Sequence, residues 1–251
     1  MRDFGMGFAQ FLAGQRWVAR HRREYGLGLV PALITLVIYG AALVGVITWG
    51  GDVTETLTPF ADGWPSPWLG LFRGALMVAL IALAVLVAAL TFTAVTLLIG
   101  SPFYDVISER VDRSVSPDGS APESGLAWWV ELWISVRDSA RILVRAMLWA
   151  VLLFVLGFVP VIGQTVIPVL AVFVTGFFLT QELTSVALQR RGAHLNQQMA
   201  MLRSRKTVAW GFGAPLAAAF LIPVVAVFLM PGAVAGATLL SRQLLGEPTR
   251  V

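Results

Sequence analysis

The stretch VPVIGQTVIPVL, residues 159–170, places two prolines, a glycine and an amide inside a long apolar region. The apolar arms on either side are residues 142–158 and 166–179, about 17 and 14 residues long. A helix needs roughly 20 apolar residues to cross a bilayer, so both arms are short for a full span. We therefore interpret residues 142–180 as a helical hairpin that penetrates a membrane only partly, with Pro160 and Gly163 turning the chain.

The alternative is a pair of ordinary, slightly short spanning helices joined by a tight loop. A turn at membrane depth must be buried in protein or line a wet cavity, because lipid offers no hydrogen bonds to its backbone. Gln164 and Thr165 follow the turn directly. We expect their side chains to satisfy backbone groups that the turn leaves unpaired.

The composition supports a bilayer as the solvent: 57% of the residues are hydrophobic and 13% are charged. A soluble domain has far more charge. The sequence therefore predicts an all-α integral membrane protein, a single membrane domain over residues 1–251. Residues 27–49 and 74–99 are long enough for two transmembrane helices, and Pro31 suits the first turn of the earlier one.

A second proline-broken hairpin is expected at residues 208–240. Its predicted breaks are Ile222-Pro223 and Met230-Pro231-Gly232. Transporters often build their binding sites from such discontinuous helices. The shapes of the two hairpins therefore favour a transport protein, although no residue-level repeat relates them.

Two further segments are predicted to be amphipathic. Residues 1–25 carry Phe4, Phe8 and Phe11 on one helical face, which indicates an interfacial helix. Residues 101–141 are predicted to form a polar and amphipathic helical segment. Ser101-Pro102 is typical of a helix start, and the composition of residues 114–125 is typical of a flexible linker. From Trp128 an apolar face is expected to continue to about Arg141, with Trp129, Leu132, Trp133 and Val136 on one side.

Enzyme signatures are missing from the sequence. There is no HExxH, GxSxG or Walker-type loop, and His21 and His194 lie far apart outside the apolar runs. We expect no enzymatic activity, no metal and no cofactor. The arginines flank apolar runs, where they contact lipid headgroups, so nucleic-acid binding is the weaker interpretation of the basic charge.

Anion binding is better supported. The segment RREYGLGLVP, residues 22–31, places two arginines and two glycines just before a predicted membrane helix. A helix N-terminus carries about half a positive charge, and arginine offers forked donors to oxyanions. The alternative is that these are ordinary arginines flanking a membrane helix. Arg145 allows two interpretations as well: a residue facing a cavity or partner, or one that extends to the interface.

Several stretches together resemble one family. SPFYDVISERVD (101–112), VPVIGQTVIPVL (159–170) and MLRSRKTVAWGFGAPLAAAFLIPVVAVFLMPGAVAGAT (201–238) are similar to the CysZ sulfate permeases of the etoposide-induced-protein superfamily. The order and spacing match over roughly residues 20–242. The resemblance implies a multi-pass protein of the bacterial inner membrane, with two long transmembrane helices, two partly penetrating hairpins and assembly as a homo-oligomer.

The leading hypothesis is a permease for sulfate or a related oxyanion that supplies cysteine synthesis. The family resemblance implies an anion site just before the first membrane helix. Polar groups near the hairpin tip are expected to line the pathway. The alternative function is a non-transporting protein of the same superfamily that organises membranes or assists assembly. The residues expected to bind the anion are Arg22, Arg23, Gly26, Leu27 and Gly28, and those expected along the pathway are Gln164, Thr165 and Arg145.

Overall fold

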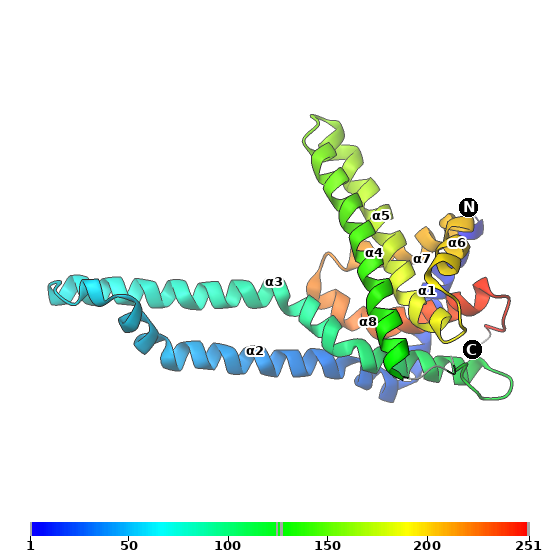
Figure 1. The fold of residues 1–251 in the computed structure, drawn as a ribbon, viewed down its shortest axis with the longest axis horizontal. Coiled ribbons are helices and arrows are strands. Elements are labelled where there is room, and N and C mark those ends of the chain that lie inside the picture. Colours follow the sequence, from blue (N-terminus) through cyan, green and yellow to red (C-terminus); the bar gives the residue numbers. More distant parts are fainter. Residues whose placement is uncertain (1, 124, 126–127, 250–251) are drawn as a thin grey trace. The chain divides into compact units, whose positions relative to one another are not determined.

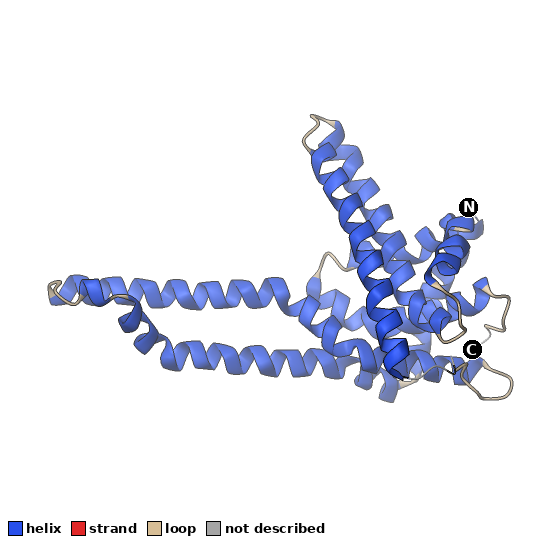
Figure 2. Cartoon of the chain, viewed as in Figure 1, coloured by secondary structure: helices blue, strands red, loops and turns tan. Residues whose placement is uncertain are grey.

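The computed structural model describes residues 2–123, 125 and 128–249. Across these residues every regular element is a helix, which confirms the predicted all-α class (Figure 1 and Figure 2). The chain divides into two compact units, one of residues Leu29–Ser101 and one of Met1–Gly28 together with Pro102–Val251. The elements are α1 (Arg2–Arg20), α2 (Arg22–Leu57), η1 (Pro59–Ala61), α3 (Ser66–Val115), α4 (Trp128–Gly157), α5 (Ile162–Gln189), α6 (Leu195–Ser204), α7 (Lys206–Ala219) and α8 (Pro223–Leu244).

Within the described residues, five helical stretches are long and apolar enough to cross a membrane. They are Arg22–Leu57, Ser66–Phe92, Val136–Gly157, Ile162–Gln189 and Val224–Leu244. The protein is therefore a multi-pass membrane protein by length and composition. None of the most apolar part of Ser66–Phe92 is buried inside the protein, which is the exposure that a lipid-facing helix requires.

Three predicted helix boundaries at prolines are wrong. Pro31, Pro102 and Pro231 all lie inside continuous helices. A proline removes one backbone hydrogen bond, but ending the helix in an apolar environment would leave several backbone groups unpaired. Residues 101–115 accordingly continue α3 instead of starting a new helix, and Met230-Pro231-Gly232 does not break α8.

The unit of residues Leu29–Ser101 consists of the long parts of α2 and α3, which run antiparallel beside each other (Figure 1). The Tyr39 hydroxyl and the Thr91 hydroxyl form a hydrogen bond of 2.6 Å between the two helices. At the connecting loop the Arg73 guanidinium donates to Asp62 at 2.6 Å and to Thr58 at 3.2 Å. These polar contacts connect two helices whose exposed surface is mostly apolar.

In the other unit, α4 and α5 form an antiparallel hairpin (Figure 1). These helices have 30 and 28 residues, because both continue into polar sequence beyond the apolar arms. Helix length therefore does not decide whether the hairpin crosses the membrane fully or enters it only partly, and partial penetration stays a prediction. On the predicted apolar face of α4, the side chains of Trp128 and Leu132 lie outside the described part of the protein, as does residue 124 of the predicted linker.

The turn between α4 and α5 differs in detail from the prediction. Pro160 lies in the turn, but the residue with a left-handed backbone is Val161, at φ 68°. Gly163 lies in the first turn of α5, where a Cβ atom would overlap the carbonyl of Gly157. Gly163 is therefore required for close packing of the two helix ends and not for the turn itself.

Close backbone contacts between α1 and α8 form the centre of the same unit. The buried face of α1 contains Gly7, Phe11 and Gly14, and a Cβ atom on Gly14 would overlap the backbone of Gly232 and Gly236 in α8. The Gly232-x-x-x-Gly236 pattern, which can pack helices of different subunits, is covered here by α1 of the same chain.

We predict opposite effects for alanine at two glycines of α1. Gly14→Ala forces α1 and α8 apart and should cost about 1–3 kcal/mol, as overpacking of a tight contact does. Gly5→Ala is the matched control, because a Cβ at Gly5 meets nothing within 4 Å and alanine has the better helix propensity. Thermal unfolding of the two purified variants in detergent measures the difference, and equal melting temperatures would contradict the packing.

Candidate functional site

The residues predicted to bind an anion lie in the first two turns of α2. α1 ends at Arg20, and the intervening His21 stacks on the Trp17 ring with a centroid distance of 4.3 Å. The His21 carbonyl accepts the backbone N–H of Tyr25 at 3.0 Å. The three preceding N–H groups, those of residues 22–24, begin the helix and have no helical partner. These N–H groups give the N-terminus of α2 a partial positive charge.

The five predicted side chains have different surroundings. Arg22 and Arg23 are exposed, and across the described residues neither makes an ion pair or hydrogen bond. Gly26 is exposed with open space around it, and Leu27 is half-buried. Gly28 is buried, and a Cβ there would lie 2.5 Å from the Pro231 ring, so this glycine packs α2 against α8.

One acidic residue lies in the same turn of α2. Glu24 accepts a hydrogen bond of 3.0 Å from Arg110 of α3, and its side chain is largely buried. The carboxylate is thus already paired with a guanidinium, and the charges of Arg22 and Arg23 are left without a protein carboxylate. The arrangement can attract an anion from water.

The structure does not bring Arg145 to the hairpin tip. Arg145 lies on α4 twelve residues before the helix ends at Gly157, a separation of about 18 Å along the axis. At the tip, the Thr165 hydroxyl donates to the Val161 carbonyl at 2.7 Å, which also accepts the Thr165 backbone N–H at 3.2 Å, so this carbonyl is not one that the turn leaves unpaired. Gln164 is exposed.

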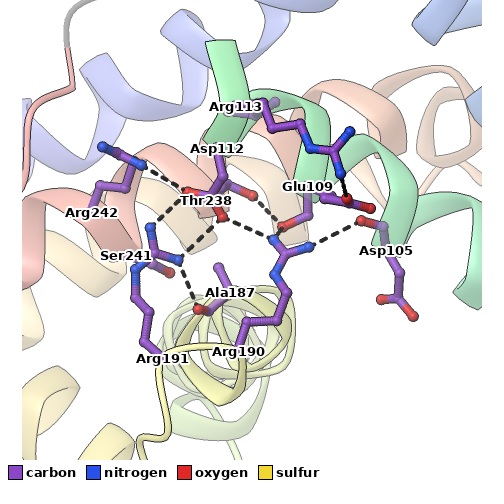
Figure 3. Close-up of polar contacts among 12 residues, drawn as sticks. Asp105, Glu109, Asp112, Arg113, Ala187, Arg190, Arg191, Thr238, Ser241 and Arg242 are labelled. Carbon is purple, nitrogen blue, oxygen red and sulfur yellow. Dashed lines mark hydrogen bonds and ion pairs between the residues drawn. The ribbon is translucent and has the colours of Figure 1, made fainter. Parts of the chain in front are cut away.

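A second polar centre surrounds Asp112 of α3, whose side chain is fully buried (Figure 3). Arg191, at the end of α5, donates to both carboxylate oxygens at 2.7 and 3.2 Å. Arg190 donates to the same carboxylate at 3.0 Å and Arg242 of α8 at 3.1 Å. One carboxylate therefore connects α3, α5 and α8.

Hydroxyl groups complete this centre. Thr238 donates its proton to the Val234 carbonyl at 3.0 Å, so in its 2.7 Å contact with Ser108 the Ser108 hydroxyl is the donor. The Ser108 oxygen in turn accepts from Arg190 at 2.6 Å. The neighbours of these two hydroxyl groups therefore fix the direction in which each donates its proton.

A second carboxylate, Glu247, lies at the edge of the centre. Arg191 donates to its two oxygens at 2.8 and 2.7 Å, and this hydrogen bonding holds the pKa of Glu247 below its ordinary value. Burial opposes the charge of Arg191, but hydrogen bonds to Glu247 and Asp112 outweigh it and raise the pKa of that guanidinium. Both groups are charged at neutral pH.

The donors of Arg191 are all taken by the protein, because its remaining N–H group bonds the Ala187 carbonyl at 2.9 Å. Arg242 donates from Nε to the Pro248 carbonyl and from Nη1 to Asp112 and Ser116. The centre around Asp112 therefore holds helices together, and it offers few free donors to a ligand. Among the described residues no group of three or more His, Asp or Glu side chains is placed to hold a metal ion.

Sequence reasoning missed the centre around Asp112. Asp105, Glu109 and Asp112 follow one another at the spacing of one helix face, a pattern typical of a solvated helix, and nothing in it sets Asp112 apart. Asp112 is separated from Arg191 by 79 positions and from Arg242 by 130. The one local signal is Arg242 itself, a charge that directly follows the apolar run of α8.

Comparison with known proteins identifies the family. The family model described as "Sulfate transporter CysZ/Etoposide-induced protein 2.4" matches residues 10–231. The chain belongs to this family. The match spans all of the polar contacts described at the start of α2 and confirms the resemblance noted in the sequence.

Relatives in the CysZ family are similar over most of their length. A Vibrio cholerae protein named sulfate transporter CysZ is 28% identical over 233 residues, 86% of this chain and 89% of its own. A protein of the same name from Pseudomonas paraeruginosa is 27% identical over 84% of this chain and 84% of its own length. One from Pseudomonas fluorescens is 30% identical over 84% of this chain and 83% of its own length.

Removing the central carboxylate should destabilise this CysZ-family protein strongly. Asp112→Asn leaves three arginines without their shared counter-ion, which typically costs about 3–5 kcal/mol and corresponds to a melting temperature lower by about 10 °C. Asp118→Asn is the control, since Asp118 is exposed and bonds only Ser120 nearby. Thermal unfolding in detergent tests this, and similar melting temperatures for the two variants would refute the central role of Asp112.

Glu247 should make stability depend on pH in a defined direction. Because the folded protein lowers the pKa of Glu247, its stabilising contribution is complete above the unfolded value of about 4.3 and is lost as pH falls through the lower folded value. Wild type should therefore melt higher than Glu247→Gln at about pH 7, and the gap should close toward about pH 3. Glu123→Gln, at an exposed loop residue, should show no such closing gap. A constant gap for Glu247→Gln would contradict the ion pair.

Proposed function

We propose that this protein is a sulfate permease of the bacterial inner membrane that supplies sulfate for cysteine synthesis. Membership of the family and the relatives named sulfate transporter CysZ support the substrate. Five candidate membrane spans support a multi-pass location. The sequence contains no nucleotide-binding loop, and we propose a passive or ion-coupled permease.

The observation that carries the proposal is the difference between two groups of arginines. Arg190, Arg191 and Arg242 are buried and bonded to Asp112. Arg22 and Arg23 are exposed, without an ion pair to any described residue, at the N-terminus of a helix that is long enough to span a membrane. The second group therefore exposes its donors to an anion that arrives from water, whereas the guanidinium groups of the first group are buried against Asp112.

The chemistry at this point suits a tetrahedral oxyanion. The two guanidinium groups present forked N–H donors, and the open backbone N–H groups of residues 22–24 add donors and a partial positive charge. Gly26 leaves space beside them, and the half-buried Leu27 borders the site. Glu24, held by Arg110, adds a negative charge nearby that keeps binding weak enough for release.

The path beyond this entrance is proposed to involve the hairpin of α4 and α5. Gln164 and Thr165 place polar groups at its tip, in an otherwise apolar surface. Hairpins that penetrate the membrane partly would place these groups inside the bilayer, where a second copy of the chain could complete a polar path. The homo-oligomer is thus part of the same proposal.

A second function is favoured by the exposed apolar tip of that hairpin. Phe154, Phe158 and Val161 are each about 70% exposed. Such a tip could act as a wedge in one leaflet, and the protein would then organise membranes or assist assembly without transporting an anion.

Uptake of labelled sulfate into proteoliposomes distinguishes the two functions. We expect wild type to take up sulfate and Arg22→Ala/Arg23→Ala to lose most of the rate, by about tenfold or more, because two charge-assisted contacts are removed. The control is Arg203→Ala/Arg205→Ala, which removes the same charge from an exposed part of α6 and its end.

Each outcome has a defined meaning. Equal loss in both variants would show a general charge effect and would refute the entrance at Arg22 and Arg23. Uptake that persists in both variants would keep the permease and reject this entrance. Absence of uptake above empty liposomes, with protein that melts cooperatively, would reject the permease in favour of the membrane-organising function.

A further inference from the structure

One face of α4 combines arginines with apolar side chains in a regular pattern. Arg137, Arg141 and Arg145 follow one another at four-residue spacing, which places them on one side of the helix about 6 Å apart along its axis. Beside them runs an apolar row. The side chains that line a shallow groove along this face all come from α4 itself and include Trp133, Val136, Ala140 and Val144.

No other part of the described protein covers this face. The Trp133 side chain is 69% exposed and Val144 is 58% exposed. Helix α4 packs against α5 on its other side. A water-soluble protein would not expose such an apolar row, so the face requires a partner that is apolar and anionic at once.

The charge of the face is incompletely balanced within the protein. Arg141 has a long contact of 3.5 Å with Asp138, and Glu182 of α5 accepts from Ser139 at 3.1 Å. Arg137 and Arg145 make no ion pair across the described residues. The face therefore keeps a positive charge in a helix whose stretch Val136–Gly157 is apolar enough to enter a membrane.

The position of the arginines along the hairpin fits the boundary of a bilayer. Arg145 is the last charged residue before Glu182, so the intervening 36 residues carry no charge. Arginines that precede such a stretch lie at the level of the lipid phosphates, with tryptophan at the same interface. Guanidinium forks match phosphate oxygens, and the adjacent apolar row matches an acyl chain.

We propose that this face of α4 binds anionic phospholipids, with the phosphate on Arg137, Arg141 and Arg145 and the acyl chain along the row of Trp133, Val136, Ala140 and Val144. A free oxyanion such as sulfate shares the phosphate chemistry, but it leaves the apolar row without a partner. The proposal concerns a lipid site and does not depend on sulfate transport.

Native mass spectrometry of the full-length, delipidated protein in detergent tests the site with phosphatidylglycerol as the probe. Wild type should bind phosphatidylglycerol in preference to phosphatidylcholine. Arg137→Gln/Arg141→Gln/Arg145→Gln should weaken that binding roughly 100-fold, from the contribution of three arginines near anionic lipid. The control, Arg203→Gln/Arg205→Gln/Lys206→Gln, removes the same charge from exposed positions elsewhere and should keep most of the affinity.

A lysine variant and a competition measurement separate a lipid site from a site for free oxyanions. If the glutamine variant does not fold, Arg137→Lys/Arg141→Lys/Arg145→Lys keeps the charge but loses the fork, and it should still bind roughly tenfold more weakly. Equal binding by the variants and the control would overturn the site. Displacement of the lipid from wild type by sodium sulfate, but not by sodium chloride of equal ionic strength, would also overturn it, because the site would then be one for free oxyanions.

Discussion

The buried carboxylate of Asp112 is the interaction on which the helical core of residues 102–251 depends. Two ends of apolar helices, Arg191 after α5 and Arg242 in α8, meet α3 through this one group. Burying a guanidinium is costly unless it is paired, so each arginine here requires Asp112, and Asp112 requires them. The mutual requirement fixes which turns of α3, α5 and α8 face each other, whereas apolar side chains alone would allow the helices to slide.

The glycine contacts also fix how the helices pack against each other, but they do so by close backbone packing instead of charge. At Gly14 the backbones of α1 and α8 approach so closely that no side chain fits between them. In a membrane protein the lipid is as apolar as the core, so close packing replaces the hydrophobic effect as the force between helices. Polar bonding at one end of α8 and backbone packing near its middle together hold this helix.

Sequence reasoning found the membrane class and the apolar helices because those depend on local composition. It failed at Pro31 and Pro102, which were read as marking helix starts, and at Pro231, which was read as a break, because the apolar surroundings favour a continuous helix at all three. It also missed the centre around Asp112, because partners 79 and 130 positions away leave no local pattern. The arginine pair at residues 22–23 is visible in the sequence, since it is charge before an apolar run, and its role as an anion site stays a prediction.

Arginine occurs in three kinds of surroundings in this protein, and each kind suits a different partner. Where carboxylates and a backbone carbonyl take every donor, as at Arg191, the guanidinium holds the fold and has little to offer a ligand. Where the side chains are exposed beside open backbone N–H groups, as at Arg22 and Arg23, the surroundings suit a small hydrated anion. Where guanidinium groups alternate with apolar side chains, as along α4, neither water nor a small anion satisfies the whole face. The number of free donors and the polarity of the neighbouring side chains, more than the charge itself, decide which partner each arginine can have.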